Sequence, residues 1–209
     1  MSIRKSVHTV HIKGRVINLN DGKMFEKVCR EQIQEVAYIY RINDFGNLVG
    51  IKNPCDHLAY KYPYFYMLEN KAYSGASLPL KAISDYQLQS MLDARKYKGI
   101  LPYFLVWYID KDVTRAIYVD VIAELRETNK KSIRYDYKDS RIINIEGTKK
   151  KKYFVYDWVK FFKEAANEEV NRSGRGQLSK ARTVSTRNSR QIFIYNGRVH
   201  RKYKKCTRY

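Results

Sequence analysis

Apolar residues recur along the first 170 positions at two different spacings, and these predict alternating helices and strands. Spacing of three and four residues predicts helices over residues 21–38, 85–97 and 156–170. Short alternating or continuous apolar runs predict strands over residues 56–61, 64–71, 100–109 and 115–122. The run at 100–109 is apolar throughout, which is typical of a strand buried on both faces. The order of these elements predicts a small α/β domain with a mixed sheet flanked by helices.

The chain beyond residue 170 has a different pattern. Residues 171–190 consist largely of Ser, Arg, Gly, Thr and Asn, so we expect a flexible linker there. Asn196-Gly197 separates two short alternating runs, and this pair predicts a β-hairpin in which Tyr195 faces Arg198 and Ile194 faces Val199. A basic tail that contacts DNA without folding is an equally good reading. The sequence thus predicts a basic arm at 1–20, a folded domain at 21–170 and a basic extension at 171–209.

Charge points to a polyanionic partner. The chain has 41 Lys and Arg against 21 Asp and Glu, a net charge of +20. Residues 171–209 contain no acidic residue and 12 basic ones, so they carry most of this excess. Nucleic acid is the first expectation and an anionic membrane surface the second. The alternative is the amino-acid bias of a low-GC genome, which raises Lys, Asn, Ile and Tyr together.

The spacing of the cysteines and the hydropathy of the chain indicate the cellular compartment in which the protein functions. The three cysteines are far apart and form no CxxC pair, which disfavours a disulfide framework or a zinc module. The N-terminal residues lack the apolar core of a signal peptide, and the longest apolar run is too short to cross a bilayer. We therefore expect a cytoplasmic protein with no membrane association.

Three charged residues could carry chemistry. Glu69 and Lys71 are two positions apart in one predicted strand, so they project from the same face, and Asp56 begins the adjoining strand. If the strands pair, two carboxylates and an ammonium group meet at one edge of the sheet. Carboxylates are ligands for Mg²⁺, and an amine beside them can orient water and offset charge on a phosphate. A solvated strand face is the competing interpretation, because Glu-x-Lys arises easily in a chain with 30% charged residues.

These residues stand in a recognisable order. Asn53-Pro54-Cys55-Asp56 followed by Leu68-Glu69-Asn70-Lys71 resembles the metal motif of the PD-(D/E)xK nuclease superfamily, and so implies a restriction-endonuclease-like core. More narrowly, the chain resembles the RecU-type Holliday junction resolvases of low-GC Gram-positive bacteria and their phages. The further matches are Gly22, Phe25-Glu26, residues 77–80, Gln87, Gly99-Ile100 and residues 131–134.

The resemblance implies a role for each matching residue. Asp56 and Glu69 would ligate Mg²⁺, or Mn²⁺ as a substitute, together with the backbone carbonyl of Asn70. Lys71 would position the attacking water and stabilise the transition state. Glu26 would hold the water shell of the metal, and Gln87 would orient the substrate or the nucleophile. By composition alone, Glu26 and Gln87 would be ordinary helix-surface residues.

DNA contacts are expected in two places. Lys131, Ser132 and Arg134 resemble a family motif that contacts the DNA backbone, although charges at these positions could equally be plain surface residues. Arg198, Arg201 and Lys202 are candidates from the charge of the tail. Residues 44–51 read as a turn around Gly46-Asn47, a short equivalent of the stalk that the family inserts into a junction.

The implied activity is that of an endodeoxyribonuclease. It would resolve four-way junctions by paired symmetric nicks during recombination and repair, acting as a homodimer on branched DNA, with a recombinase as a possible partner. If phage-encoded, it would work in the cytoplasm of the bacterial host. Two alternatives remain: another PD-(D/E)xK nuclease of branched-DNA or restriction-like type, and a non-catalytic DNA-binding recombination accessory protein.

Overall fold

A computed structural model describes residues 9–12, 15–43, 52–150, 154–182, 193–195 and 198–200 of the chain, with side chains at 21–43, 52–150 and 154–172. The chain divides into two units, residues 1–170 and 171–209, which are described separately below.

The first unit is built on a mixed sheet. Six of its described strands form this sheet in the order β10-β8-β7-β5-β4-β3. Their bounds are Tyr38–Arg41 (β3), His57–Lys61 (β4), Tyr64–Tyr73 (β5), Ile100–Tyr108 (β7), Val113–Tyr118 (β8) and Ile142–Asn144 (β10). The neighbours β5 and β7 are parallel, and every other pair in this sheet is antiparallel. The predicted mixed α/β fold is confirmed.

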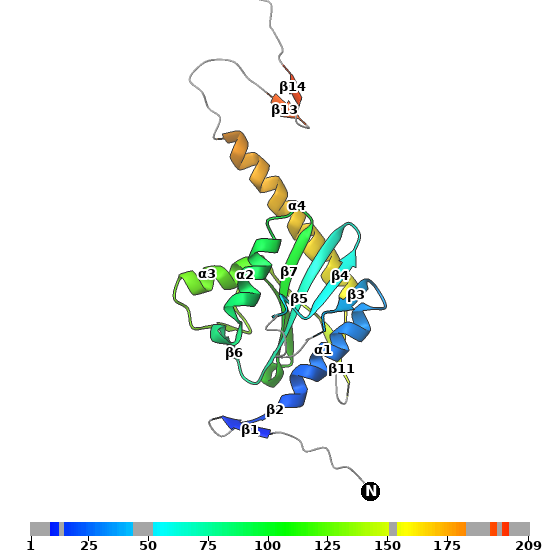
Figure 1. Ribbon diagram of the computed structural model, residues 1–209, viewed down its shortest axis with the longest axis vertical. Coiled ribbons are helices and arrows are strands. Elements are labelled where there is room, and N and C mark those ends of the chain that lie inside the picture. The colour runs from blue at the N-terminus through cyan, green and yellow to red at the C-terminus, as the bar shows by residue number, and fades with distance from the viewer. Residues whose placement is uncertain are drawn as a thin grey trace, which may run out of the picture. The chain divides into compact units, whose positions relative to one another are not determined.

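Helices cover both faces of the sheet (Figure 1). On one face, Phe25 of α1 (Leu19–Ile33) contacts Trp107, with ring centroids 5.9 Å apart. The start of α4 (Trp158–Arg182) packs there too, with Phe162 4.8 Å from Tyr66 between ring centroids. On the opposite face, α2 (Asp85–Ala94) and α3 (Val119–Glu127) pack against each other and the sheet. The core is therefore closed above and below β5 and β7.

Smaller elements complete the first unit. Three two-stranded pairs accompany the main sheet within the described residues: β1 (Thr9–Ile12) with β2 (Arg15–Asn18), β6 (Ser77–Pro79) with β9 (Ser132–Arg134), and β11 (Gly147–Lys149) with β12 (Phe154–Tyr156). Two 3₁₀ turns, Leu80–Ala82 and Ile109–Lys111, join larger elements. The arm, which the sequence left without assigned order, thus contains a strand pair.

Two predicted segments have the other type of secondary structure. The first helix ends at Ile33, and Tyr38–Arg41 forms β3, because these residues meet β4 in register. The predicted strand at 115–122 ends at Tyr118, and the chain continues as α3. Val119, Val121, Ile122 and Leu125 are all buried, so a helical apolar stripe starts inside a run of β-branched residues that looks like a strand.

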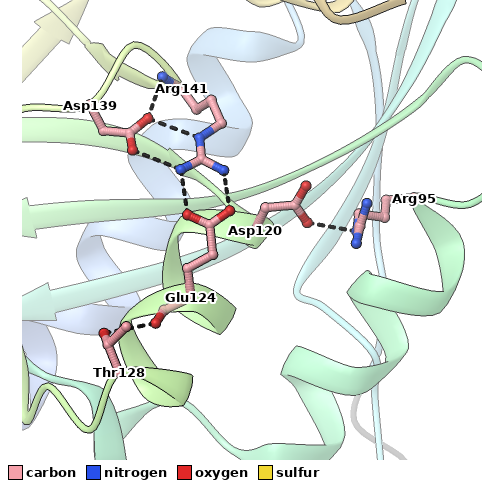
Figure 2. A network of polar contacts seen from close by, with 6 residues as sticks. All are labelled: Arg95, Asp120, Glu124, Thr128, Asp139 and Arg141. Atoms are coloured by element: carbon pink, nitrogen blue, oxygen red, sulfur yellow. Dashed lines mark hydrogen bonds and ion pairs between the residues drawn. The ribbon is translucent and has the colours of Figure 1, made fainter. Parts of the chain in front are cut away.

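A network of charged groups ties α3 to the segment before β10 (Figure 2). The guanidinium of Arg141 donates to both carboxylate oxygens of Glu124 at 2.6 Å, and to those of Asp139 at 2.8 and 2.9 Å. Hydrogen bonding to Arg141 lowers the pKa of both Glu124 and Asp139. Beside it, Arg95 at the end of α2 pairs with Asp120 on α3, 2.6 Å apart. These contacts hold the two helices against the sheet.

The second unit differs in part from the prediction. Residues 171–182 continue α4 rather than forming a flexible linker. A helix that is already nucleated extends at low cost through Gln, Leu, Lys, Ala and Arg, even past two glycines. The hairpin prediction is confirmed: β13 (Phe193–Tyr195) and β14 (Arg198–His200) pair with Tyr195 opposite Arg198 and Ile194 opposite Val199. The turn residues 196–197, and the rest of the predicted linker at 183–190, lie outside the described residues, as does the turn expected at 44–51.

Within the described residues, no helix is both long and apolar enough to pass through a bilayer.

Candidate active site

Asp56 lies where strand pairing between β4 and β5 stops. The last pair of this ladder is His57 with Leu68. Two residues further along β5, the amide of Asn70 donates to Oδ2 of Asp56 over 2.7 Å. The Asp56 carboxylate thus accepts the hydrogen bond that a backbone carbonyl of a neighbouring strand would otherwise accept. This bond fixes it against β5, next to Glu69.

Glu69 holds the centre of the cluster. Its side chain is 2% exposed, and its Oε1 accepts hydrogen bonds from Lys71 Nζ and from Gln87 Nε2, each over 2.7 Å. Gln87 reaches it from the first turn of α2, which Ser84 caps by accepting from the Gln87 amide. Oε2 of Glu69 is buried and has no hydrogen-bond partner among the described residues. One oxygen of a buried carboxylate is therefore left unsatisfied.

Burial of both carboxylates, and the charge of Glu69 beside Asp56, disfavour their ionised forms in the metal-free protein. Desolvation, followed by the charge of Glu69, raises the pKa of Asp56 to about 7. Desolvation also raises the pKa of Glu69, against the opposing effect of Lys71. A cation bound between the two would reverse both effects, because it favours the ionised form of each group.

The donor set fits Mg²⁺. This ion keeps several of its waters and is commonly bound through one or two carboxylates together with substrate phosphate. Asp56 and Glu69 supply two carboxylates, and Oε2 of Glu69, which has no hydrogen-bond partner among the residues that the structure describes, could bind a cation. In the described part of the chain, no group of three or more His, Cys, Asp or Glu side chains comes together as a metal cluster. A metal here would therefore depend on water and substrate for its remaining ligands.

Glu26 stands apart from this cluster. It lies on α1 and accepts from Nε of Arg41 over 2.5 Å, and Arg41 pairs with His57 in the sheet. Its charge contributes to the raised pKa of Asp56, after burial and Glu69. The structure thus brings Asp56, Glu69, Lys71 and Gln87 together, and Glu26 affects Asp56 through its charge.

Sequence reasoning missed the groups that support the site from the α1 face. His57 is buried, and its Nδ1 lies 3.2 Å from Oδ1 of Asn70. Burial lowers the pKa of His57, which favours the neutral ring. Nε2 of His57 and Nδ2 of Asn70 have no hydrogen-bond partner in the described residues. The only sign of His57 and Asn70 in the sequence is the alternation of side chains along a strand. Because they directly follow Asp56 and Glu69, they must face the other side of the sheet.

A groove of about 810 Å³ opens next to Ser84. We call it the Lys131 groove; it is lined by residues from segments 77–85 and 126–132, among them Lys81, Lys130, Lys131 and Ser132. Ser132 is held by a 2.9 Å hydrogen bond from Ser77 across the β6–β9 pair. Two of the predicted DNA-binding residues, Lys131 and Ser132, thus line a groove that also includes Ser84 and Asp85 at the start of α2. Lys81 and Lys130 add positive charge that the sequence did not single out.

The other predicted DNA contacts are placed differently. Arg134 ends β9 and makes two 2.9 Å hydrogen bonds to Asp136, so its guanidinium is already held by a carboxylate. Arg198 begins β14 in the second unit. Arg201 and Lys202 lie outside the described residues.

Comparison with models of known protein families finds no match, and comparison with the sequences of curated proteins finds none either. Among solved structures, the chain is similar to Hjc of Archaeoglobus fulgidus, a Holliday junction resolvase from an archaeal hyperthermophile. The two are 18% identical with a TM-score of 0.38, over 47% of this chain and 78% of that one. A likeness at this level says nothing about the chemistry of this chain.

Proposed function

We propose that the protein is a Mg²⁺-dependent, structure-selective DNA endonuclease of the RecU type. It resolves four-way junctions by paired, symmetric hydrolysis of phosphodiester bonds. The observation that carries this proposal is the buried Glu69 carboxylate: Lys71 and Gln87 hold one oxygen, and the other has no hydrogen-bond partner within the described part of the chain. A buried, partly unsatisfied carboxylate costs stability, and so its presence beside Asp56 favours a functional role.

The residues divide the work of phosphate hydrolysis. A Mg²⁺ ion held by Asp56 and Glu69 would act as a Lewis acid on the phosphate and lower the pKa of bound water. Lys71 uses one of its three N–H groups on Glu69, and its side chain is 21% exposed, so two donors remain for water or a phosphate oxygen. Gln87 fixes the orientation of the Glu69 carboxylate through a single hydrogen bond.

The proposed substrate is branched DNA. The Lys131 groove gives the sugar–phosphate backbone a basic channel beside Gln87. The surplus of positive charge on residues 171–209 adds an electrostatic grip that does not depend on sequence. Paired nicks require two copies of the site on one junction, and we therefore propose a homodimer.

A cleavage assay tests the proposal. We expect the protein with Mg²⁺ to nick a four-way junction at symmetric positions, and to act more slowly on a flap and on linear duplex of the same sequence. Asp56→Asn and Glu69→Gln should abolish nicking while junction binding is retained.

Two control variants distinguish the effect of losing an active-site carboxylate from the effect of losing a carboxylate elsewhere. Asp93→Asn changes an exposed residue of α2, and Glu127→Gln an exposed residue of α3, so both should keep full activity. Full activity of Asp56→Asn would disprove the site. Equal rates on all three substrates would favour a less selective nuclease, and binding without any Mg²⁺-dependent nicking would favour an accessory protein.

A further inference from the structure

A second hollow, away from Asp56 and Glu69, contains a buried arginine. The Arg115 cavity has a volume of about 430 Å³ and is lined by parts of β8, the segment 135–138 and the segment 144–147. Arg115, on β8, is 6% exposed. Its Nε donates to Oδ1 of Asn144 over 2.8 Å and its Nη1 to the carbonyl oxygen of Tyr137 over 2.7 Å. Its Nη2 has no hydrogen-bond partner among the described residues.

The positive charge of Arg115 is not neutralised by a direct ion pair. Both acceptors that hold it are uncharged, whereas buried arginines are normally paired with an anion. Three carboxylates line the cavity, and each is already paired with another cation. The pairs are Asp112 with Lys149 (2.5 Å), Asp136 with Arg134 (2.9 Å) and Glu146 with Lys160 (2.5 Å). Lys138, which is exposed, lines the same cavity. The three carboxylates are thus offset by their own cations, and the charges of Arg115 and Lys138 are left over, which suits the cavity to an anion.

Strand register relates this cavity to the candidate active site. Lys71 on β5 is paired with Val106 on β7, and Val106 with Arg115 on β8. Paired residues share a face, so Lys71 and Arg115 lie in one row on one side of the sheet, roughly 10 Å apart at two strand spacings. Strand β9 lies between the two hollows in sequence: its Ser132 lines the Lys131 groove, and Tyr135, just after it, lines the Arg115 cavity.

We propose that the Arg115 cavity binds a phosphate group through Nη2 of Arg115 and the ammonium group of Lys138. Resting on the function proposed above, this phosphate belongs to the backbone of the bound DNA and is separate from the one that is hydrolysed. A phosphate held in the same row as Lys71 fixes the position of the DNA across β5, β7 and β8. Arg115 thereby acts as a positioning residue.

The first test uses inorganic phosphate on the full chain without metal. The melting temperature of the wild type is measured in phosphate and in chloride at equal ionic strength. Phosphate should raise it, and the increase should fall by more than half in Lys138→Ala and in Arg115→Gln. Lys163→Ala, an exposed lysine on α4, should respond as the wild type does. An equal phosphate effect in the wild type and Lys138→Ala would overturn the proposal even if Arg115→Gln does not fold.

The second test identifies the source of the phosphate. DNA affinity is measured in EDTA over a range of salt concentrations, so that the result does not depend on cleavage. Losing one phosphate contact should lower the slope of log affinity against log salt by about 0.9, and Lys138→Ala should weaken binding about tenfold. Arg115→Lys keeps the charge but loses the planar donor pair, and should weaken binding without changing the slope.

Outcomes separate this inference from the proposed function. Loss of the phosphate effect together with the lower slope supports the inference. Loss of the phosphate effect with an unchanged slope overturns the assignment to DNA and identifies a site for free phosphate. Nicking by the wild type is measured separately, so a failure of the proposed nuclease activity would leave both binding results readable.

Discussion

Replacing Asp56 with Asn should stabilise the metal-free protein while it abolishes cleavage. Burial and the neighbouring charge of Glu69 raise the pKa of Asp56 from 3.8 to about 7. Keeping this carboxylate ionised at pH 8 therefore costs the folded state about 4 kcal/mol, at 1.36 kcal/mol for each pKa unit. The amide oxygen of Asn can still accept from the Asn70 amide, and the extra strength of the hydrogen bond to the ionised carboxylate is already included in this pKa.

The gain at pH 8 is therefore about 4 kcal/mol, which raises the melting temperature of a chain of this size by roughly 8–16 °C. Because the folded-state pKa is raised, the wild type binds its proton more tightly when folded. Its stability is complete below pH 4 and falls as the pH rises from about 4 to about 7. The advantage of Asp56→Asn should therefore be absent at pH 4 and reach its full size above pH 7.

Thermal unfolding in EDTA at pH 4, 6 and 8 measures this difference, with Asp93→Asn as the exposed control. Added Mg²⁺ should then stabilise the wild type and leave Asp56→Asn unchanged. If Asp56→Asn is less stable than the wild type in EDTA at pH 8, the carboxylate is a structural group, and the argument from unfavourable burial fails.

Three further predictions concern other parts of the molecule. Gln87→Ala removes the hydrogen bond to Glu69 and should slow nicking by about 10- to 100-fold, while Gln89→Ala on the same helix leaves it unchanged. Arg141→Gln should lower stability at pH 7 by about 1 kcal/mol, and because the pKa values of its two carboxylate partners are lowered, the loss should disappear as the pH falls below about 4 in unfolding experiments. Deleting residues 171–209 should weaken junction binding and flatten its salt dependence, as measured by titration at several salt concentrations; an unchanged slope would show that these residues do not contact DNA.

The strands were predictable where local signals agreed. The runs that became β4, β5 and β7 are bounded by Pro or Gly and are short for helices. The run beginning at Val113 was misread because β-branched residues continue into α3, and a strand and a buried helix turn look alike over so few positions. The end of α1 was misplaced because Tyr38–Arg41 becomes a strand only through pairing with β4.

The convergence of Asp56, Glu69 and Lys71 was predictable because a hairpin joins their two strands and fixes the register by itself. The contact from Gln87 depends on how α2 packs, and spacing along the chain does not encode that. The row from Lys71 to Arg115 depends on the parallel register of β5 with β7, which joins segments 35 residues apart and leaves no local pattern.

The bond from the Asn70 amide to Asp56 offers a spectroscopic handle on the site. This amide lies two positions beyond the end of the β4–β5 ladder, and its acceptor is a side chain whose charge changes with pH and metal. Its proton resonance should therefore follow the ionisation of Asp56 directly, and its rate of exchange with solvent should report how often this end of the ladder opens. A single backbone nucleus could thus be used to follow metal loading in solution without DNA and without turnover.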